Sequence, residues 1–249
     1  MVLFLSRKDK MDNPVIIALD FVSAKETVNF LKHFASEQDL WVKVGMELFY
    51  GEGPGLIKYL RSEGLHVFLD LKIYDIPNTV KQAMKQIGQL GVELTTVTGL
   101  GGSQMIAAAK EGLLLGAAEA SLVTPKLLAI TQLTSMNEEA MHQTLQNDQC
   151  SMEASVKHLA QLAASAGADG VISSALEAPE IHQQISKDFL SINPGIRLQS
   201  DALDDQARVV TPAQAHDLGS NGIVVGRTIT RSSDPLAAYK AVKSDFRRE

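Results

Sequence analysis

Apolar runs and amphipathic stretches alternate along almost the whole chain. Eight short runs rich in β-branched and other apolar residues predict strands. They lie at residues 15–20 (VIIALD), 41–46 (WVKVGM), 67–72 (VFLDLK), 93–99 (ELTTVTG), 127–133 (LLAITQL), 170–174 (GVISS), 189–192 (FLSI) and 222–226 (GIVVG). Near-continuous apolar runs of this kind are typical of parallel strands that helices cover on the outside.

The stretches between these runs have helical patterns. One opens with Ser23, followed three residues later by Glu26, which is the spacing of a capping box. Val28, Leu31 and Phe34 then recur every three residues and predict a single apolar helix face. Further helix starts are expected at Pro54, Pro77, Pro212 and Pro235. Proline suits the first helical turn because the N–H that it lacks would have no partner within the helix.

Eight strands alternating with helices predict a (β/α)8 TIM barrel that forms a single domain. The 249 residues suit this fold and allow a large core. An open doubly wound sheet is the alternative, but it usually has a glycine-rich turn after its first strand, and residues 18–26 contain no glycine. We expect residues 1–13 to form an N-terminal tail and residues 14–249 the barrel, with Met1 or Met11 as the natural start.

Composition and charge narrow the classes of partner. The formal net charge of −6 disfavours binding to nucleic acid. No apolar run approaches the roughly 18 residues of a membrane span, and the short apolar N-terminus precedes its basic cluster, unlike a secretory signal. Cys150 is the only cysteine, so no intrachain disulfide can form. These features together predict a cytoplasmic protein.

In a barrel of this type, active sites lie at the carboxyl ends of the strands. Asp70 and Lys72 interrupt one apolar strand, and Lys43 lies within another. The period of two along a strand places Asp70 and Lys72 on one face and Leu69 and Leu71 on the other. Buried charges are costly unless they are paired. The cluster is therefore either a structural salt bridge or a functional charge array, and three charges from two strands favour the array.

A second polar group follows the seventh and eighth expected strands, where barrels often bind phosphate. Residues 193–211 form an expected polar loop that contains Arg197, and Gly226 with Arg227 ends the last strand. Glycine lets backbone N–H groups approach an anion, and arginine supplies forked donors. The pattern predicts phosphate binding by these residues, whereas Arg231 is interpreted as an ordinary surface residue.

Other chemistry has less support in the sequence. Thr134 and Ser135, after the fifth strand, can either hydrogen-bond a planar heterocycle or cap the next segment. The histidines are scattered and there is no cysteine cluster, so we predict no metal site. Asp70 and Asp75 carry carboxylates that suit Mg²⁺, but Lys72 between them competes for the same oxygens.

Together these segments resemble the bacterial orotidine 5′-phosphate decarboxylases. The strings ALD, VKVG, DLKIYDIPNTV, LTS, PGIR, DDQAR and VVGR occur in the family's order, and the resemblance extends from Val15 to about Lys243. It implies a (β/α)8 barrel that acts as a homodimer without metal or organic cofactor. It also implies a carboxy-lyase that converts orotidine 5′-monophosphate (OMP) to UMP and CO₂, the last step of de novo pyrimidine nucleotide synthesis.

The same resemblance implies roles for individual residues. Lys72 corresponds to the proton donor to C6 of the pyrimidine, and Asp70 to a carboxylate beside the substrate carboxylate. Lys43 corresponds to a lysine that contacts the ribose and the charge array. Asp75 and Thr79 correspond to residues that reach into the partner subunit's site. The remaining substrate-binding positions are Asp20 for the ribose, Thr134 for the pyrimidine, and Arg197, Gln206, Gly226 and Arg227 for the phosphate.

Two positions depart from the family pattern: Thr98 replaces a frequent histidine, and Asn193 stands where threonine is common. Residues 193–206 are the expected lid over the phosphate. The nearest alternative is an Mg²⁺-dependent sugar-phosphate decarboxylase or aldolase on the same barrel plan, which the LTS and DDQAR strings disfavour. More distant alternatives are a Schiff-base aldolase that uses Lys72 or Lys43, and a barrel that only binds nucleotides, which the intact charge array disfavours.

Overall fold

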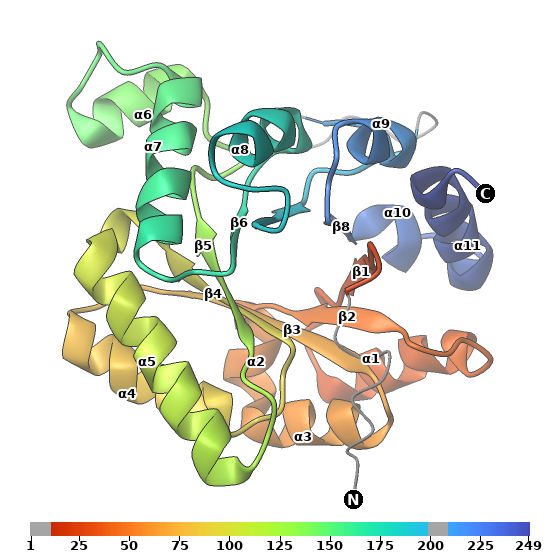
Figure 1. The fold of residues 1–249 in the computed structure, drawn as a ribbon. Coiled ribbons are helices and arrows are strands. Elements are labelled where there is room, and N and C mark those ends of the chain that lie inside the picture. The colour runs from red at the N-terminus through yellow and green to blue at the C-terminus, as the bar shows by residue number, and fades with distance from the viewer. Residues whose placement is uncertain (1–10, 199–208) are drawn as a thin grey trace, which may run out of the picture.

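The computed structural model describes residues 11–198 and 209–249. Eight parallel strands close into one barrel in sequential order, with helices on the outside (Figure 1). The predicted (β/α)8 barrel and all eight predicted strands are confirmed. The strands are β1 (Val15–Ala18), β2 (Trp41–Val44), β3 (His66–Ile73), β4 (Leu94–Thr98), β5 (Lys126–Ile130), β6 (Gly170–Ile172), β7 (Leu190–Asn193) and β8 (Gly222–Val225).

Eleven α-helices and three 3₁₀ helices are found in the described parts of the chain. The α-helices are α1 (Ala24–Leu31), α2 (Met46–Glu52), α3 (Pro54–Ser62), α4 (Pro77–Gly88), α5 (Gly102–Ala120), α6 (Glu138–Leu145), α7 (Met152–Ser165), α8 (Ala178–Gln184), α9 (Pro212–Asp217), α10 (Arg227–Thr230) and α11 (Pro235–Arg247). The 3₁₀ helices are η1 (Lys32–Phe34), η2 (Gly99–Gly101) and η3 (Ala175–Glu177). The four prolines expected at helix starts begin α3, α4, α9 and α11.

The first helix begins where it was predicted, and its predicted apolar face is confirmed in part. The Ser23 hydroxyl accepts the N–H of Glu26, which is one of the two hydrogen bonds of the predicted capping box. The buried residues of α1 are Thr27 and Phe30, whereas Val28 is only half-buried. The Phe30 ring packs 5.0 Å from the Phe21 ring and 5.2 Å from the Phe34 ring. Of the predicted face, Phe34 is buried and Leu31 packs against the core, whereas Val28 was placed too deep because the ring of Phe30 faces the core beside it.

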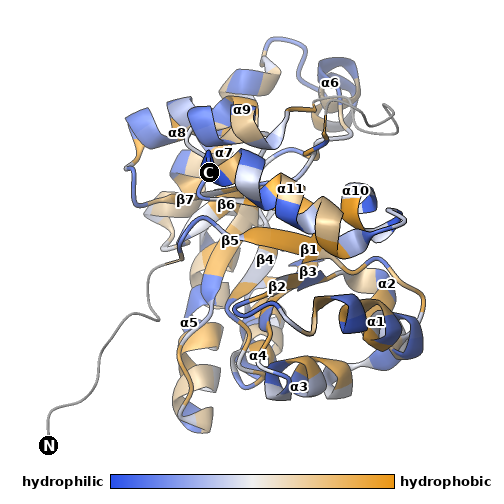
Figure 2. Cartoon of the chain, turned by 90° about the vertical axis from the view of Figure 1, so that its right-hand side faces the viewer, coloured by the Kyte–Doolittle hydropathy of each residue, from blue (hydrophilic) through white to orange (hydrophobic). Residues whose placement is uncertain are grey.

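The core has two layers, one inside the barrel and one between the strands and the helices. Figure 2 shows apolar residues along the strands and polar residues on the outer surfaces of α1 and α3. The interior is filled by Ile16, Ala18, Phe68, Leu94, Leu128, Ile192 and Val224. Because side chains alternate along a strand, the residues two positions after Ala18, Phe68 and Leu94 lie at the mouth of the barrel on the same inner face. None of the helices within the described ranges is long and apolar enough to cross a membrane.

The prediction of a polar loop over residues 193–211 is wrong at its first residue. Asn193 is the last residue of β7 and is fully buried, and its amide donates a hydrogen bond to the Ser173 carbonyl at 3.0 Å. Ile196 and Val210 pair as an isolated parallel bridge, which joins the two ends of the segment. Residues 199–208, and with them Gln206 and most of the expected lid, lie outside the described residues.

Candidate active site

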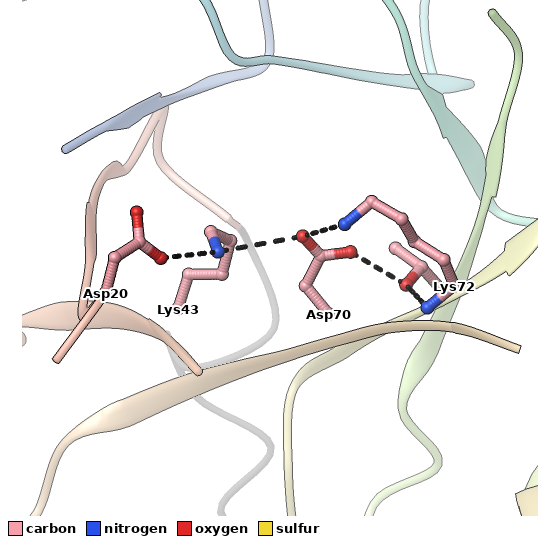
Figure 3. Close-up of polar contacts among 5 residues, drawn as sticks. Asp20, Lys43, Asp70 and Lys72 are labelled. Atoms are coloured by element: carbon pink, nitrogen blue, oxygen red, sulfur yellow. Dashed lines mark hydrogen bonds and ion pairs between the residues drawn. The ribbon is translucent and has the colours of Figure 1, made fainter. Parts of the chain in front are cut away.

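Four charged side chains form a line at the carboxyl ends of β1, β2 and β3 (Figure 3). The Lys72 ammonium lies 2.8 Å from Oδ2 of Asp70, and the Lys43 ammonium lies 3.7 Å from the same oxygen. Lys43 also lies 3.4 Å from Oδ1 of Asp20. The signs alternate along the line, so every charge has an opposite neighbour. This line of Asp20, Lys43, Asp70 and Lys72 is called the charge array below.

The strand register explains why these side chains meet. Lys43 of β2 pairs with Ala18 of β1 and with Phe68 of β3. Asp20 and Asp70 each follow those partners by two residues, and side chains two apart on a strand share a face. Both carboxylates therefore lie one step beyond Lys43 on the inner side of the barrel, with the lysine between them.

The members of the charge array differ in burial: Asp70 is buried, whereas Lys72 and Asp20 are partly exposed. Asp70 is only 7% exposed, and a carboxylate so buried must be paired. The Lys72 side chain keeps 33% of its surface exposed and the Asp20 side chain 65%. The pair of Asp70 and Lys72 therefore has a fixed carboxylate and an ammonium group that a ligand in the barrel mouth can reach.

The backbone at Lys72 departs from a regular strand. The register pairs Leu69 with Thr95 and Ile73 with Val97, so this part of β3 contains two more residues than β4. Lys72 itself has φ +50°, in the left-handed region. For a residue other than glycine this conformation costs about 1–3 kcal/mol and is concentrated at functional sites. The distortion accompanies the contact between Lys72 and Asp70 that brings the charges together.

Thr96 was not predicted from the sequence, although it touches two members of the charge array. Its hydroxyl lies 2.9 Å from the backbone nitrogen of Lys72 and 2.9 Å from Oδ1 of Asp70. A usable signal was present, because Leu94 faces the barrel interior and Thr96 follows it by two residues. A polar residue at an inner position of the strand next to Asp70 is a candidate for a hydrogen bond to its carboxylate.

The predicted phosphate residues that the structure describes lie after β7 and β8: Arg197 follows β7, and Gly226 and Arg227 follow β8. Gly226 directly follows β8, and a Cβ placed there would lie 3.7 Å from Oδ2 of Asp20, so its backbone lies beside the charge array. Arg227 begins α10 and is half-buried. The Arg197 backbone N–H donates to the Val210 carbonyl at 3.1 Å, which ties this arginine to the closed base of its loop.

Three other predicted residues lie away from these contacts. Thr134 is half-buried in the turn after β5. Asp75 and Thr79, after β3, are exposed, and the Asp75 carboxylate accepts the N–H of Ile76 at 2.7 Å. Within one chain, therefore, the structure brings together Asp20, Lys43, Asp70 and Lys72, and leaves Asp75 and Thr79 directed to the surface.

No group of three or more His, Cys, Asp or Glu side chains that could hold a metal ion occurs within residues 11–198 and 209–249. A cavity of about 590 Å³ lies between α6, α7 and α8, and its lining includes no member of the charge array. Its walls carry four glutamates and one lysine. The strand ends, and not this cavity, therefore carry the chemistry considered below.

A closed parallel barrel with paired lysines and aspartates at its strand ends, next to a glycine–arginine step after β8, defines a (β/α)8-barrel enzyme site for an anionic substrate. The family model described as "Orotidine 5'-phosphate decarboxylase / HUMPS family" matches residues 13–242. The chain belongs to this family, and the resemblance stated from the motifs is confirmed.

Individual relatives cover nearly the same span. The orotidine 5'-phosphate decarboxylase of Latilactobacillus sakei is 52% identical over 236 residues, which is 95% of this chain and 98% of that protein. The one from Enterococcus faecalis is 50% identical over 235 residues, 94% of this chain and 98% of that protein. The crystal structure of the Lactobacillus acidophilus enzyme superposes with a TM-score of 0.84 at 46% identity, covering 94% of this chain and 99% of that one.

Proposed function

We propose that this chain decarboxylates OMP to UMP and CO₂. The observation that carries the proposal is the position of Lys72: its ammonium lies 2.8 Å from the buried Asp70, and a third of its side-chain surface stays exposed at the mouth of the barrel. The relatives named above carry the name of this activity over almost the full length of the chain. The alternative on the same barrel plan, an Mg²⁺-dependent sugar-phosphate enzyme, has no comparable support among these relatives.

The reaction needs a cation close to the carbon that loses CO₂. When the bond between C6 and the carboxylate breaks, the electron pair stays on C6, where no adjacent carbonyl group can accept it. A preorganised positive charge stabilises this transition state. We assign that charge to Lys72, which then transfers a proton from Nζ to C6 as general acid. CO₂ leaves as a neutral molecule and the lysine is left uncharged.

Asp70 supports this role in two ways. Its Oδ2 lies 2.8 Å from the Lys72 ammonium and holds this group in place at the mouth of the barrel. Its negative charge also disfavours the substrate carboxylate relative to departing CO₂. Stabilisation of the transition state is the larger effect, because preorganised charge near the developing carbanion usually contributes most to catalysis.

The other predicted residues would bind the remote parts of the nucleotide. Binding energy from groups far from the reacting bond can be used to order the charges around it. We assign the ribose to Asp20 and Lys43, the pyrimidine to Thr134, and the phosphate to Arg197, Gln206, Gly226 and Arg227, with Gln206 outside the described residues.

We further propose that the chain forms a homodimer with shared active sites. Tyr74 and Ile76 flank Asp75 and are 68% and 67% exposed, and Leu100 after β4 is 45% exposed. Large apolar side chains gathered beyond two neighbouring strands favour contact with another protein surface. A second copy covering them would bring Asp75 and Thr79 toward the site of the partner subunit.

Removing the charge of Arg227 should weaken substrate binding. We expect Arg227→Ala to lower kcat/KM for OMP by more than about tenfold, beyond the roughly 1 kcal/mol of a surface ion pair. The nucleoside orotidine, which lacks the phosphate, should react poorly with the wild type and be nearly indifferent to the substitution. Steady-state kinetics with both substrates measure this, and Arg231→Ala, at an exposed arginine four residues later, is the control. Equal losses with both substrates would remove Arg227 from the phosphate site.

Gly45 leaves space for the Lys43 ammonium. A Cβ at Gly45 would lie 3.2 Å from Nζ of Lys43, whereas its φ of −89° suits alanine. We expect Gly45→Ala to fold normally and to lower kcat/KM by about two- to tenfold, because a small misplacement of a positioned group slows the reaction. Gly55→Ala is the control, since a Cβ there meets nothing within 4 Å. Unchanged kinetics in Gly45→Ala would mean that the position of Lys43 is not critical.

Chelation should leave the activity intact. The Asp70 oxygens are already engaged by Lys72, Lys43 and Thr96, so the proposed reaction proceeds through the lysine. We expect protein treated exhaustively with EDTA to form UMP from OMP at the rate of untreated protein. Loss of activity that Mg²⁺ restores would instead support the sugar-phosphate alternative.

The Schiff-base alternative has its own test. Borohydride added with substrate should leave the activity of this protein unchanged, whereas it would inactivate an enzyme that forms a Schiff base with its substrate.

A further inference from the structure

The uncharged side chain of Thr96 bridges the backbone of Lys72 and the carboxylate of Asp70. It lies on β4 and is fully buried, on the inner face shared with Leu94. Its Oγ1 lies 2.9 Å from the Lys72 backbone nitrogen and 2.9 Å from Oδ1 of Asp70. One hydroxyl group therefore meets both the residue assigned as proton donor and the residue that orients it.

The direction of both hydrogen bonds follows from the chemistry of the groups. A backbone N–H only donates, so the Thr96 oxygen accepts from Lys72. A carboxylate paired with ammonium groups only accepts, so the Thr96 proton is directed to Asp70. A hydroxyl can do both at once, whereas valine, of the same shape, can do neither.

The backbone distortion explains why Lys72 needs this partner. Between the pairs Leu69–Thr95 and Ile73–Val97 the regular register of β3 and β4 is interrupted, and Lys72 adopts φ +50°. A backbone N–H without a partner in the interior costs about 1–3 kcal/mol. The Thr96 hydroxyl accepts this N–H in place of a strand carbonyl and so stabilises the left-handed conformation.

The second hydrogen bond sets the rotation of the carboxylate. Thr96 binds Oδ1 of Asp70, while Oδ2 of the same group faces the Lys72 and Lys43 ammonium groups at 2.8 and 3.7 Å. Each oxygen thus has a distinct partner. Without the hydroxyl, the carboxylate can turn toward either ammonium group, and the distance from Lys72 to C6 is no longer fixed.

We propose that Thr96 is a positioning residue for the decarboxylation, holding the Lys72 backbone and the Asp70 carboxylate in the geometry that presents the Lys72 ammonium to C6. This role rests on the proposed function. It concerns the arrangement of the reacting groups, because the hydroxyl acts through Lys72 and Asp70 and is not itself assigned a contact with substrate.

The test compares Thr96→Val and Thr96→Ser with Thr95→Val. Thr95 is the adjacent, equally buried residue of β4, and its hydroxyl has no hydrogen-bond partner among the residues that the structure describes, so it is a matched control. We expect Thr96→Val to lower kcat about 10- to 100-fold with KM within about threefold, as displaced reacting groups do. Thr96→Ser should keep kcat within about fivefold of wild type, and Thr95→Val should match wild type.

A crystal structure of Thr96→Val gives a readout that does not depend on activity. We expect Lys72 to leave its left-handed conformation, or the Asp70 carboxylate to turn away from Lys72. The proposal is overturned if both groups keep their positions, if Thr96→Val matches Thr95→Val in kcat, or if Thr96→Ser loses as much as Thr96→Val. If Thr96→Val does not fold, Thr96→Ala, which leaves room for a water, is compared with Thr96→Ser in the same way. Wild-type protein inactive on OMP would refute the proposed function, whereas the crystal structure would still decide whether Thr96 holds these groups.

Discussion

The substitution Lys72→Ala is expected to lower kcat for OMP by more than about 10⁴-fold. General acid catalysis alone contributes roughly 10²–10⁴-fold, and this lysine is also assigned the electrostatic stabilisation of the transition state. The variant should fold, because Asp70 keeps Lys43 at 3.7 Å and the Thr96 hydroxyl at 2.9 Å. Single-turnover kinetics measure the loss of catalysis, and thermal unfolding measures any loss of stability. Lys58→Ala, at an exposed position of α3, is the control for both measurements.

Lys72→Met would distinguish charge from side-chain volume, because methionine has a similar length and no ammonium group. It should be as inactive as the alanine variant. Retention of more than about a tenth of wild-type kcat by either variant, with the fold intact, would refute the assignment of Lys72 as cation and proton donor.

The second large effect concerns mixed dimers. Homodimers of Lys72→Ala and of Asp75→Asn are each expected to be nearly inactive, because every site lacks one of the two groups. If each site takes Lys72 from one subunit and Asp75 from the other, a heterodimer has one site with both lesions and one with neither. Random exchange in an equal mixture should restore about a quarter of wild-type activity, since half of the dimers are mixed.

The exchange itself must be verified, for example by mass spectrometry of dimers with differently tagged subunits. Subunits that exchange without a rise in activity would show that Asp75 acts within its own chain or has no part in the reaction. The Asp75 side chain is exposed and accepts a local hydrogen bond from the Ile76 N–H, which is the structural reason to expect a role across the proposed interface.

The barrel was predictable from the sequence because its signals are local. The buried parallel strands read as apolar runs, and prolines begin four of the helices. The charge array was predictable for a related reason. Charged residues within apolar strands must pair with one another when they are buried. The closed barrel brings Lys43, Asp70 and Lys72 together at the carboxyl ends of their strands.

Other features depend on contacts between segments that are distant in sequence. The left-handed conformation of Lys72 depends on the register between β3 and β4. The role of Asn193 as the buried end of β7 depends on its hydrogen bond to Ser173 of the neighbouring segment. The buried face of α1 depends on which aromatic rings pack together, so periodicity alone placed Val28 too deep. None of these can be read from spacing along one element.

The most direct test of the decarboxylation supplies purified wild-type protein with OMP and measures UMP and CO₂ together over time. We expect one UMP and one CO₂ to form for each OMP consumed, and Lys72→Ala protein in a parallel reaction to form almost none. Folded protein that leaves OMP unchanged, or that consumes it without forming equal amounts of UMP and CO₂, would refute the proposed reaction.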